Sequence, residues 1–401
     1  MTTSIETVAL VVAAPKADFT LTPITLDTVR NDEVLVEMRY SGICHTDIVL
    51  QQGLLPMVQF PAIFGHEGAG IVKAVGPNVK DKSLRVGDAV LLSFTTCGDC
   101  KACVGGQPAC CHNHPQVNHG AVRPDGSTPA SLKSDPATTV RSQYFGQSSF
   151  SKLSVVQEKS VVRLCSAAEL GKTVSEKDLA IYSPMGCGFQ TGAGTILNVL
   201  KPTATDNLVI FGLGSVGLAA LMAAAHLKST QKGTAQNMQI IAVDIVPERL
   251  QLALELGATH TINARDHPES ELAAAIRKLT PNSAGATLAV DCTGRLGSIE
   301  VMVAVIGPQG TAALVGVPPA GAEIKLDPLT FLLENKKLVG VIEGDANPAD
   351  FIPQLIGLHR AGSFPVDRLC EVYPVTKLAD AIHDMHAGSV IKPVIDWTVV
   401  E

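Results

Sequence analysis

Cysteines gather in one short segment of the sequence, CGDCKACVGGQPACC at residues 97–111. Three of them are separated by two residues each, and an adjacent pair follows: Cys97, Cys100, Cys103, Cys110 and Cys111. Four thiolates complete the tetrahedral shell of a zinc ion and leave no position for a substrate, so such a site is structural. A disulfide knot and a reactive thiol are the alternatives. The spacing favours structural zinc, with the fourth thiolate supplied by one of the adjacent cysteines.

Three other segments each carry one potential metal ligand. GICHTD contains Cys44, FGHEGAG contains His66, and GCGFQTG contains Cys187. Each is unremarkable alone, because a buried cysteine is most often a small apolar side chain. Two thiolates and one imidazole together form a ligand set used by catalytic zinc, which keeps a fourth position for water or substrate.

A glycine-rich turn predicts a site for a dinucleotide. NLVIFGLGSVGLAA places Gly212, Gly214 and Gly217 directly after an apolar strand and at the start of a helix. These glycines allow a tight turn, close approach of the backbone to a pyrophosphate, and close packing of helix on strand. The N–H groups at the helix start favour an anion. A turn needed only for packing is the alternative.

An acidic residue follows at the end of the next predicted strand. Asp244 in IIAVDI lies 27 positions beyond Gly217, and the polar stretch 228–237 indicates a loop insertion that lengthens the spacing. A carboxylate there accepts hydrogen bonds from a ribose 2′-hydroxyl and repels a 2′-phosphate, which favours NAD over NADP. Arg249, five residues further on, would weaken that discrimination.

The regions that must position these residues show two different sequence patterns. Residues 1 to about 180 carry short apolar runs among glycine and proline, which is typical of a β-rich region. From about residue 205, apolar strands alternate with helices, which predicts an α/β, doubly wound parallel sheet. We expect a β-rich domain from residues 1–187 and 342–401 and an inserted domain at 188–341. The composition of the segment 119–143 predicts a loop.

Bulk composition limits the partners. The 401 residues suggest two domains, and a net charge of −7 disfavours nucleic acid or an anionic membrane as a partner. No apolar run reaches the length of about 18 residues that crosses a bilayer. The N-terminal apolar stretch lacks a basic leader, so we expect a cytoplasmic protein. A reducing compartment favours metal binding over disulfides for its ten cysteines.

Several motifs in order carry a family resemblance over nearly the whole chain. They are GICHTD, GHEGAG, VGDAV, the cysteine cluster, GCGFQTG, GLGSVG, VDI, VGVPP and IKPVI. The chain resembles the zinc-dependent medium-chain alcohol dehydrogenases, and YFGQSSF and VIEGDANPADFIPQLI are most like the aryl- or benzyl-alcohol branch. The resemblance implies a GroES-like β-rich catalytic domain with an inserted Rossmann domain. It also implies a homodimer or homotetramer.

The resemblance assigns roles around two zinc ions per subunit. It implies catalytic zinc ligation by Cys44, His66 and Cys187, with Glu67 close behind the metal. Asp47 would hold the His66 ring, and Thr46 would bond the substrate hydroxyl and begin a proton relay. The spacing found in the family selects Cys111 as the fourth ligand of the structural zinc, beside Cys97, Cys100 and Cys103.

The resemblance also implies a set of cofactor-binding residues, with Thr191 at the nicotinamide and Lys392 at the pyrophosphate. The full set is His45, Thr191, Gly212, Gly214, Ser215, Val216, Gly217, Asp244, Arg249, Val315 and Lys392. Two positions depart from many relatives. Val49 replaces a histidine that ends the proton relay, and His45 replaces an arginine that binds phosphate, so NADH should be held less tightly.

Aromatic residues bear on the choice of substrate. Tyr144 and Phe145 fall where the family places walls of the substrate pocket, although an ordinary core role is equally open. The remaining histidines receive no function: His112, His114 and His119 are expected in a loop, and His383 and His386 on a helix face without an evident partner.

The sequence therefore predicts a zinc- and NAD-dependent enzyme that interconverts a primary, aromatic or conjugated alcohol and its aldehyde. The alternative within the family is a biosynthetic alcohol dehydrogenase or aldehyde reductase of secondary metabolism, with NADP(H) as a further cofactor choice. A remote alternative is a non-catalytic relative that binds the cofactor. That alternative predicts eroded zinc ligands, whereas Cys44, His66, Cys187 and Thr46 are all present.

Overall fold

A computed structural model describes residues 4–55, 57–230 and 238–400. The chain forms two compact units. The first combines Met1–Cys187, Asn347–Ile356 and Val366–Glu401, and the second combines Gly188–Ala346 and Gly357–Pro365. Within the described residues, no helix is both long and apolar enough to cross a bilayer.

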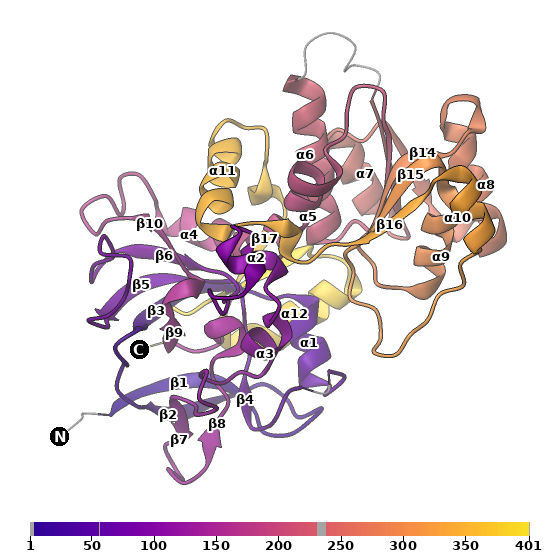
Figure 1. Ribbon diagram of the computed structural model, residues 1–401. Helices are drawn as coiled ribbons and strands as arrows, with labels where there is room; N and C mark the ends of the chain where they lie inside the picture. The colour runs from indigo at the N-terminus through magenta and orange to yellow at the C-terminus, as the bar shows by residue number, and fades with distance from the viewer. Residues whose placement is uncertain (1–3, 56, 231–237, 401) are drawn as a thin grey trace. The chain divides into compact units, whose positions relative to one another are not determined.

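The first unit is built on two sheets, and Figure 1 shows their N-terminal strands in indigo to magenta. One has the order β4 (Ala62–Ile63), β1 (Ile5–Val12), β2 (Thr20–Leu26), β7 (Ala130–Leu132), β8 (Thr139–Val140). The other has the order β10 (Val161–Cys165), β6 (Ala89–Leu92), β5 (Gly68–Val75), β3 (Glu33–Gly42), β18 (Lys392–Asp396), β17 (Cys370–Pro374), and β9 (Leu153–Gln157) also pairs with β3.

Strand β3 lies at the centre of this unit. It pairs with β5, β9 and β18, and most of its side chains are buried, because neighbours cover the strand on both sides. Apolar residues of both sheets, such as Val11, Ile24 and Val36, form one core together with Trp397. The C-terminal strand β18 therefore joins the end of the chain to the N-terminal half of the unit.

Short helices of the first unit surround these sheets. They are α1 (His45–Gln51), α2 (Lys101–Val104), α3 (His114–His119), α4 (Glu176–Tyr182) and α12 (Leu378–Ala387), with the 3₁₀ turns η2 (Tyr144–Gly146) and η4 (Ser183–Gly186). Helix α11 (Pro348–Arg360) belongs to this unit as far as Ile356.

The second unit is a parallel six-stranded sheet. Its order is β13 (His260–Asn263), β12 (Gln239–Asp244), β11 (Asn207–Phe211), β14 (Ala286–Asp291), β15 (Ile306–Leu314), β16 (Lys337–Gly340). The strand order reverses between β11 and β14, as it does at the ligand-binding crevice of doubly wound sheets. All five pairings are parallel. The predicted α/β fold class, with a Rossmann sheet beside a GroES-like β-rich domain, is confirmed.

Helices pack against this sheet, and Figure 1 shows α8 to α10 beside β14 to β16 in orange. They are α6 (Ser215–Thr230), α7 (Pro247–Glu255), α8 (Glu269–Leu279), α9 (Leu296–Val305) and α10 (Pro328–Glu334), and α5 (Gly188–Gly194) packs on α6. Strand β11 is buried throughout, so its apolar run NLVIF follows from contacts on both faces.

Two loop predictions need correction. Residues 228–230 complete helix α6, and the rest of the predicted loop at 228–237 lies outside the described residues. The segment 119–143 contains strands β7 and β8, which extend the first sheet. Its polar composition concealed these strands because both are short, with three and two residues, and β8 lies at the sheet edge.

Candidate functional site: two metal-binding clusters and a glycine turn

Three residues far apart in the sequence meet in the first unit. The ligand atoms of Cys44, His66 and Cys187 all lie within 4.8 Å of one another. Cys44 precedes helix α1, His66 precedes strand β5, and Cys187 follows η4. His66 and Cys187 are buried, and Cys44 is partly buried. Two thiolates and an imidazole at this separation fit a zinc ion with one coordination position left for substrate.

Asp47 fixes the geometry of this cluster from helix α1. Its Oδ2 accepts a hydrogen bond from the backbone N–H of Cys44 at 3.0 Å, and its Oδ1 accepts one from Gly65 at 3.0 Å. The same Oδ1 lies 3.0 Å from Nδ1 of His66, which leaves Nε2 for a metal. Carboxylate support of this kind orients a ligating imidazole. Gln147 adds to it, because its Nε2 donates to the backbone oxygen of His66 at 3.0 Å.

The charges of the cluster favour a cation. A hydrogen bond with Cys187, then the charge of His66, lowers the pKa of Cys44 well below its ordinary value against the effect of burial. Burial lowers the pKa of His66, but Asp47 and Cys44 outweigh it and raise that pKa well above the ordinary value. A bound metal takes the place of the imidazole proton, because a ligating histidine must be neutral.

A buried ion pair lies beside the cluster. Lys392 Nζ lies 2.9 and 3.0 Å from the two carboxylate oxygens of Glu67 and donates to the backbone oxygen of Ile43 at 3.1 Å. Burial raises the pKa of Glu67, and the charge of Glu67 raises the pKa of Lys392 although burial opposes it. The predicted contact of Lys392 with a pyrophosphate is not supported by this geometry, because the ammonium is buried against Glu67.

The cysteine cluster forms a second site in the same unit. The sulfurs of Cys97, Cys100, Cys103 and Cys111 lie within 4.8 Å of one another. Cys111 is buried, whereas Cys110 is exposed and is not part of the group. No two cysteines of the described chain form a disulfide. Four sulfurs at this separation suit a closed zinc site.

The glycine turn of the second unit joins β11 to α6. Gly212 has a φ of 86°, a conformation that favours glycine, and a Cβ at position 217 would overlap the backbone oxygen of Gly212. Nothing among the described residues lies within 4 Å of where a Cβ would stand at Gly214, so the backbone there is accessible. This arrangement fits the phosphates of a dinucleotide at the start of the helix. Ser215 and Val216 form the first turn of α6.

Asp244 ends β12 next to this turn. Its Oδ2 accepts a hydrogen bond from the N–H of Leu213 at 2.5 Å, and its Oδ1 accepts bonds from Ile245 at 2.7 Å and Val246 at 3.0 Å. The backbone thus holds the carboxylate at the end of the strand. Nearby on α7, Arg249 is partly buried, and its Nε has no hydrogen-bond partner among the described residues.

The other predicted cofactor residues lie on separate elements. Thr191 on α5 donates to Glu343 at 3.5 Å, and the N–H of Val315, just after β15, donates to the backbone oxygen of Asp291 at 3.1 Å. In the first unit, His45 opens α1, and its ring lies 6.2 Å from that of His386 on α12. His386 therefore has a neighbour that its position on a helix face did not reveal.

Aromatic rings border the Cys44–His66–Cys187 cluster. The ring centroids of Tyr144 and Phe145 lie 5.4 and 4.9 Å from that of His66. Phe145 has a φ of 54°, which turns the chain tightly within η2. The predicted pocket wall is thus adjacent to a metal ligand. Thr46 is also close, with its Oγ1 3.7 Å from the sulfur of Cys44, and Val49 follows on the same helix.

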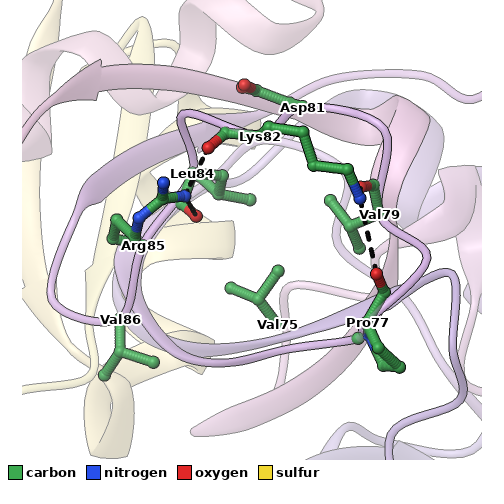
Figure 2. Close-up of a pocket in the computed structure, with 9 residues that line it drawn as sticks. Val75, Pro77, Val79, Asp81, Lys82, Leu84, Arg85 and Val86 are labelled. Atoms are coloured by element: carbon green, nitrogen blue, oxygen red, sulfur yellow. Dashed lines mark hydrogen bonds between the residues drawn. The ribbon is translucent and has the colours of Figure 1, made fainter.

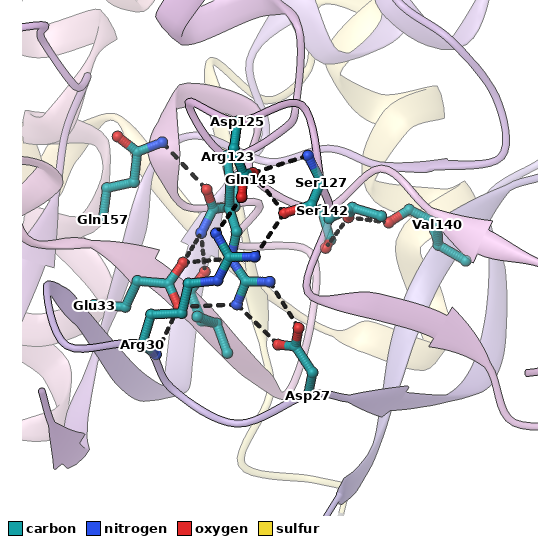
Figure 3. A network of polar contacts seen from close by, with 12 residues as sticks. Asp27, Arg30, Glu33, Arg123, Asp125, Ser127, Val140, Ser142, Gln143 and Gln157 are labelled. Atoms are coloured by element: carbon teal, nitrogen blue, oxygen red, sulfur yellow. Dashed lines mark hydrogen bonds and ion pairs between the residues drawn. The ribbon is translucent and has the colours of Figure 1, made fainter.

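A network of polar and charged groups lies at Gln143, the residue before this wall (Figure 3). The buried Arg123 guanidinium bonds Asp27 at 2.7 and 2.8 Å and Glu33 at 2.6 and 2.9 Å. Gln143, which directly precedes Tyr144, donates to Glu33 at 3.1 Å. The network therefore connects strand β3 to the start of η2. No local sequence signal marks it, because its members come from three distant segments.

A small pocket lies in the loop between β5 and β6 (Figure 2). Lys82 and Arg85 on its rim donate to backbone oxygens of their own loop, Lys82 to Val79 at 2.6 Å and Arg85 to Leu84 at 2.8 Å. The pocket contains none of the predicted site residues. Because both side chains bond their own loop, they do not indicate a ligand for this pocket.

Comparison with known proteins agrees with this layout. Residues 30–166 match the model of the alcohol dehydrogenase GroES-like domain, and residues 215–358 match that of the zinc-binding dehydrogenases. A geraniol dehydrogenase from Castellaniella defragrans is 37% identical over 374 residues, which cover 93% of each chain.

Two solved structures are similar over 98% of this chain and 99% of theirs. An alcohol dehydrogenase zinc-binding domain protein from Burkholderia ambifaria has a TM-score of 0.88 and 36% identity. Benzyl alcohol dehydrogenase from Acinetobacter calcoaceticus has a TM-score of 0.86 and 35% identity. With its two domain matches, its near full-length relatives and its two clusters of zinc-binding donors, the chain belongs to the zinc-containing medium-chain alcohol dehydrogenases and is an oxidoreductase.

Proposed function

We propose that this enzyme interconverts a primary aromatic or conjugated alcohol and its aldehyde, with NAD as the hydride carrier. The observation that carries this proposal is the aromatic wall, with the rings of Tyr144 and Phe145 5.4 and 4.9 Å from the His66 ring. Flat apolar side chains next to the reacting centre favour a flat substrate. The alcohols in the names of two relatives, geraniol and benzyl alcohol, both carry the hydroxyl on a carbon that is bonded to an unsaturated carbon, which supports this class.

In this proposal Cys44, His66 and Cys187 hold the catalytic zinc, and Cys97, Cys100, Cys103 and Cys111 hold the structural one. Bound zinc polarises an alcohol oxygen and lowers the pKa of the alcohol. Asp47 keeps the His66 ring in the orientation and tautomer that ligation needs. Thr46, whose Oγ1 is next to Cys44, would accept a hydrogen bond from the alcohol hydroxyl, take its proton and release its own hydroxyl proton to the next acceptor. Val49 has no group that could carry the proton further. The proton would therefore leave through water or the cofactor ribose.

The cofactor would lie on the glycine turn, where Gly212, Gly214 and Gly217 admit phosphates to the start of α6. A nicotinamide supplies the hydride chemistry itself. Asp244, held by three backbone N–H groups, favours a ribose with a free 2′-hydroxyl. We propose that Thr191, Val315 and Arg249, which belong to the same unit, also contact this cofactor.

The test is a substrate and cofactor screen with purified enzyme. Benzyl, cinnamyl and straight-chain aliphatic alcohols are compared with NAD and with NADP, by kcat/KM. We expect aromatic and conjugated alcohols to exceed the aliphatic ones at least tenfold, and NAD to exceed NADP. Activity with NADP alone would contradict the role of Asp244. Full activity in Cys44→Ser would contradict the metal assignment.

A second candidate is an aldehyde reductase of biosynthesis that uses NADPH. Arg249 favours it, because its Nε has no partner among the described residues and an arginine near this position accommodates a 2′-phosphate. In that case Arg249→Ala would raise the KM for NADPH and leave that for NADH unchanged. We also propose a cytoplasmic homodimer or homotetramer, which light scattering on the purified enzyme would distinguish from a monomer.

A further inference from the structure

Two histidines stand at the ends of the short helix α3, in the same unit as the Cys44–His66–Cys187 cluster. The ring of His119 lies 6.0 Å from Tyr144 and 5.7 Å from Phe145. The ring of His114 lies 6.1 Å from Phe145 and 5.9 Å from His119. Since Tyr144 and Phe145 also contact the His66 ring, the two histidines extend the aromatic wall.

These rings hold unused polar atoms. Both ring nitrogens of His114 and Nδ1 of His119 are buried without a hydrogen-bond partner among the described residues. His114 is 4% exposed, whereas His119 is only partly buried, so His119 is the more accessible of the two. A buried polar atom left without a hydrogen bond is destabilising. Two adjacent rings with such atoms therefore favour an occupant that forms hydrogen bonds.

Burial disfavours the charged form of both rings, because His114 is buried and His119 is partly buried. A neutral imidazole offers one donor and one acceptor. It therefore suits an uncharged hydroxyl, which can both accept and donate, better than a carboxylate or an ammonium.

We propose that His119 is a specificity-determining residue that hydrogen-bonds a hydroxyl on the aromatic ring of the substrate, with His114 packed behind it. The inference rests on the proposed function and narrows it from aromatic alcohols to ring-hydroxylated aromatic alcohols. Tyr144 and Phe145 hold the flat ring, the metal cluster receives the reacting alcohol, and His119 binds the substituent. A site built to bond a hydroxyl discriminates strongly against an analogue that lacks it.

The test compares kcat/KM for benzyl alcohol, the three isomeric hydroxybenzyl alcohols and the methyl ethers of their ring hydroxyls. In wild type we expect one hydroxybenzyl alcohol to exceed benzyl alcohol at least tenfold, mainly through KM, and to exceed its methyl ether. In His119→Phe, which keeps a flat ring without hydrogen bonds, that ratio should fall to within about twofold. His119→Gln keeps a polar side chain and should retain part of the preference. The exposed His112 in the same segment supplies the matched control, His112→Phe.

Zinc content and thermal unfolding of each variant establish that the fold is intact. An unchanged ratio in His119→Phe, or a wild type that turns over benzyl alcohol and all three hydroxybenzyl alcohols equally, would overturn the assignment of His119 and leave the proposed function standing. A wild type that turns over aliphatic alcohols but no aromatic alcohol would overturn both.

Discussion

At the scale of single residues, the site contains buried ionised side chains, and each is stabilised by an opposite charge or by hydrogen bonds. Glu67 and Lys392 are both buried, and each is stabilised in its charged form chiefly by the other. Asp47 differs, because two backbone N–H groups and the His66 ring share its carboxylate. Removal of one member of the Glu67–Lys392 pair therefore leaves a buried charge, whereas removal of both does not.

The first prediction follows from this pair. Lys392→Met should lower the free energy of unfolding by about 3 to 5 kcal/mol, because Glu67 loses its counter-charge. The double variant Glu67→Gln/Lys392→Met should recover at least half of that loss. Urea unfolding measures both.

The matched control is Lys73→Met, which removes the exposed ion pair of Lys73 with Glu37. It should cost less than about 1 kcal/mol. Equal losses in Lys73→Met and Lys392→Met would contradict the distinction between the two pairs.

Sequence patterns identify some of these residues and not others. Cys44, His66 and Cys187 each lie in a short glycine-bearing segment with ligand chemistry, so the sequence alone marks them as candidate ligands. The partner of Glu67 lies 325 positions away, and no local pattern indicates which carboxylate Lys392 will meet. His114 and His119 receive no function from the sequence, because only the folded chain brings Tyr144 and Phe145 to them.

At the scale of elements, buried polar groups fix the segments that carry the aromatic wall. Arg123 lies in the segment predicted as a loop, yet its guanidinium is buried and binds Asp27 and Glu33, more than 80 positions away in the chain. Gln143 joins the same network immediately before Tyr144. Local composition indicates strands and glycine turns, whereas such a network depends on tertiary pairing and leaves no periodic signal.

The second prediction tests that network. Arg123→Met should lower the free energy of unfolding by about 3 kcal/mol or more, because it leaves Glu33 buried without its cation. It should also raise the KM for benzyl alcohol, since η2 loses its anchor through Gln143. Denaturant unfolding and steady-state kinetics measure the two effects. Arg30→Met, which breaks an exposed pair with Asp125, should change neither by much; a comparable effect there would refute the argument.

The third prediction concerns pH and the central sheet. Burial raises the pKa of Glu37 on β3, but its hydrogen bond with Lys73 and the charges of Arg39, Lys73 and Lys152 outweigh this, and the net pKa is lowered. The ionised carboxylate therefore adds stability above the unfolded-state value of 4.5, and this is lost as pH falls through the lower folded-state pKa.

Glu37→Gln should thus destabilise the protein by about 1 kcal/mol at pH 7. The difference from wild type should shrink as the pH falls below 4.5. Urea unfolding of both proteins at pH 7 and at pH 4 measures it, and both retain the same metal ligands. A difference that grows on acidification would show that Glu37 has the opposite sign of shift.

At the scale of the whole molecule, the glycine turn and the donor clusters belong to different units. The parallel sheet of one unit ends in the glycine turn at the point where the strand order reverses, and the β-rich unit carries both donor clusters. The zinc-binding and cofactor-binding motifs could be identified from the sequence because each is a short continuous segment. Which cluster serves which purpose follows from the number of donors, since four thiolates close a zinc site and three ligands leave it open.

The last prediction separates the two clusters. Cys111→Ser and Cys44→Ser should each lower the zinc content measured by mass spectrometry by about one ion per chain, because each removes a ligand. Cys111→Ser should also lower the melting temperature, since a structural metal contributes folding energy directly. Cys44→Ser should abolish alcohol oxidation and change the melting temperature far less, because Asp47 still holds Gly65 and His66 in place.

Cys110→Ser, at an exposed cysteine outside the cluster, is the control and should keep both zinc ions. Zinc loss in Cys110→Ser, or a fully stable Cys111→Ser, would mean that the fourth thiolate of the structural site is Cys110.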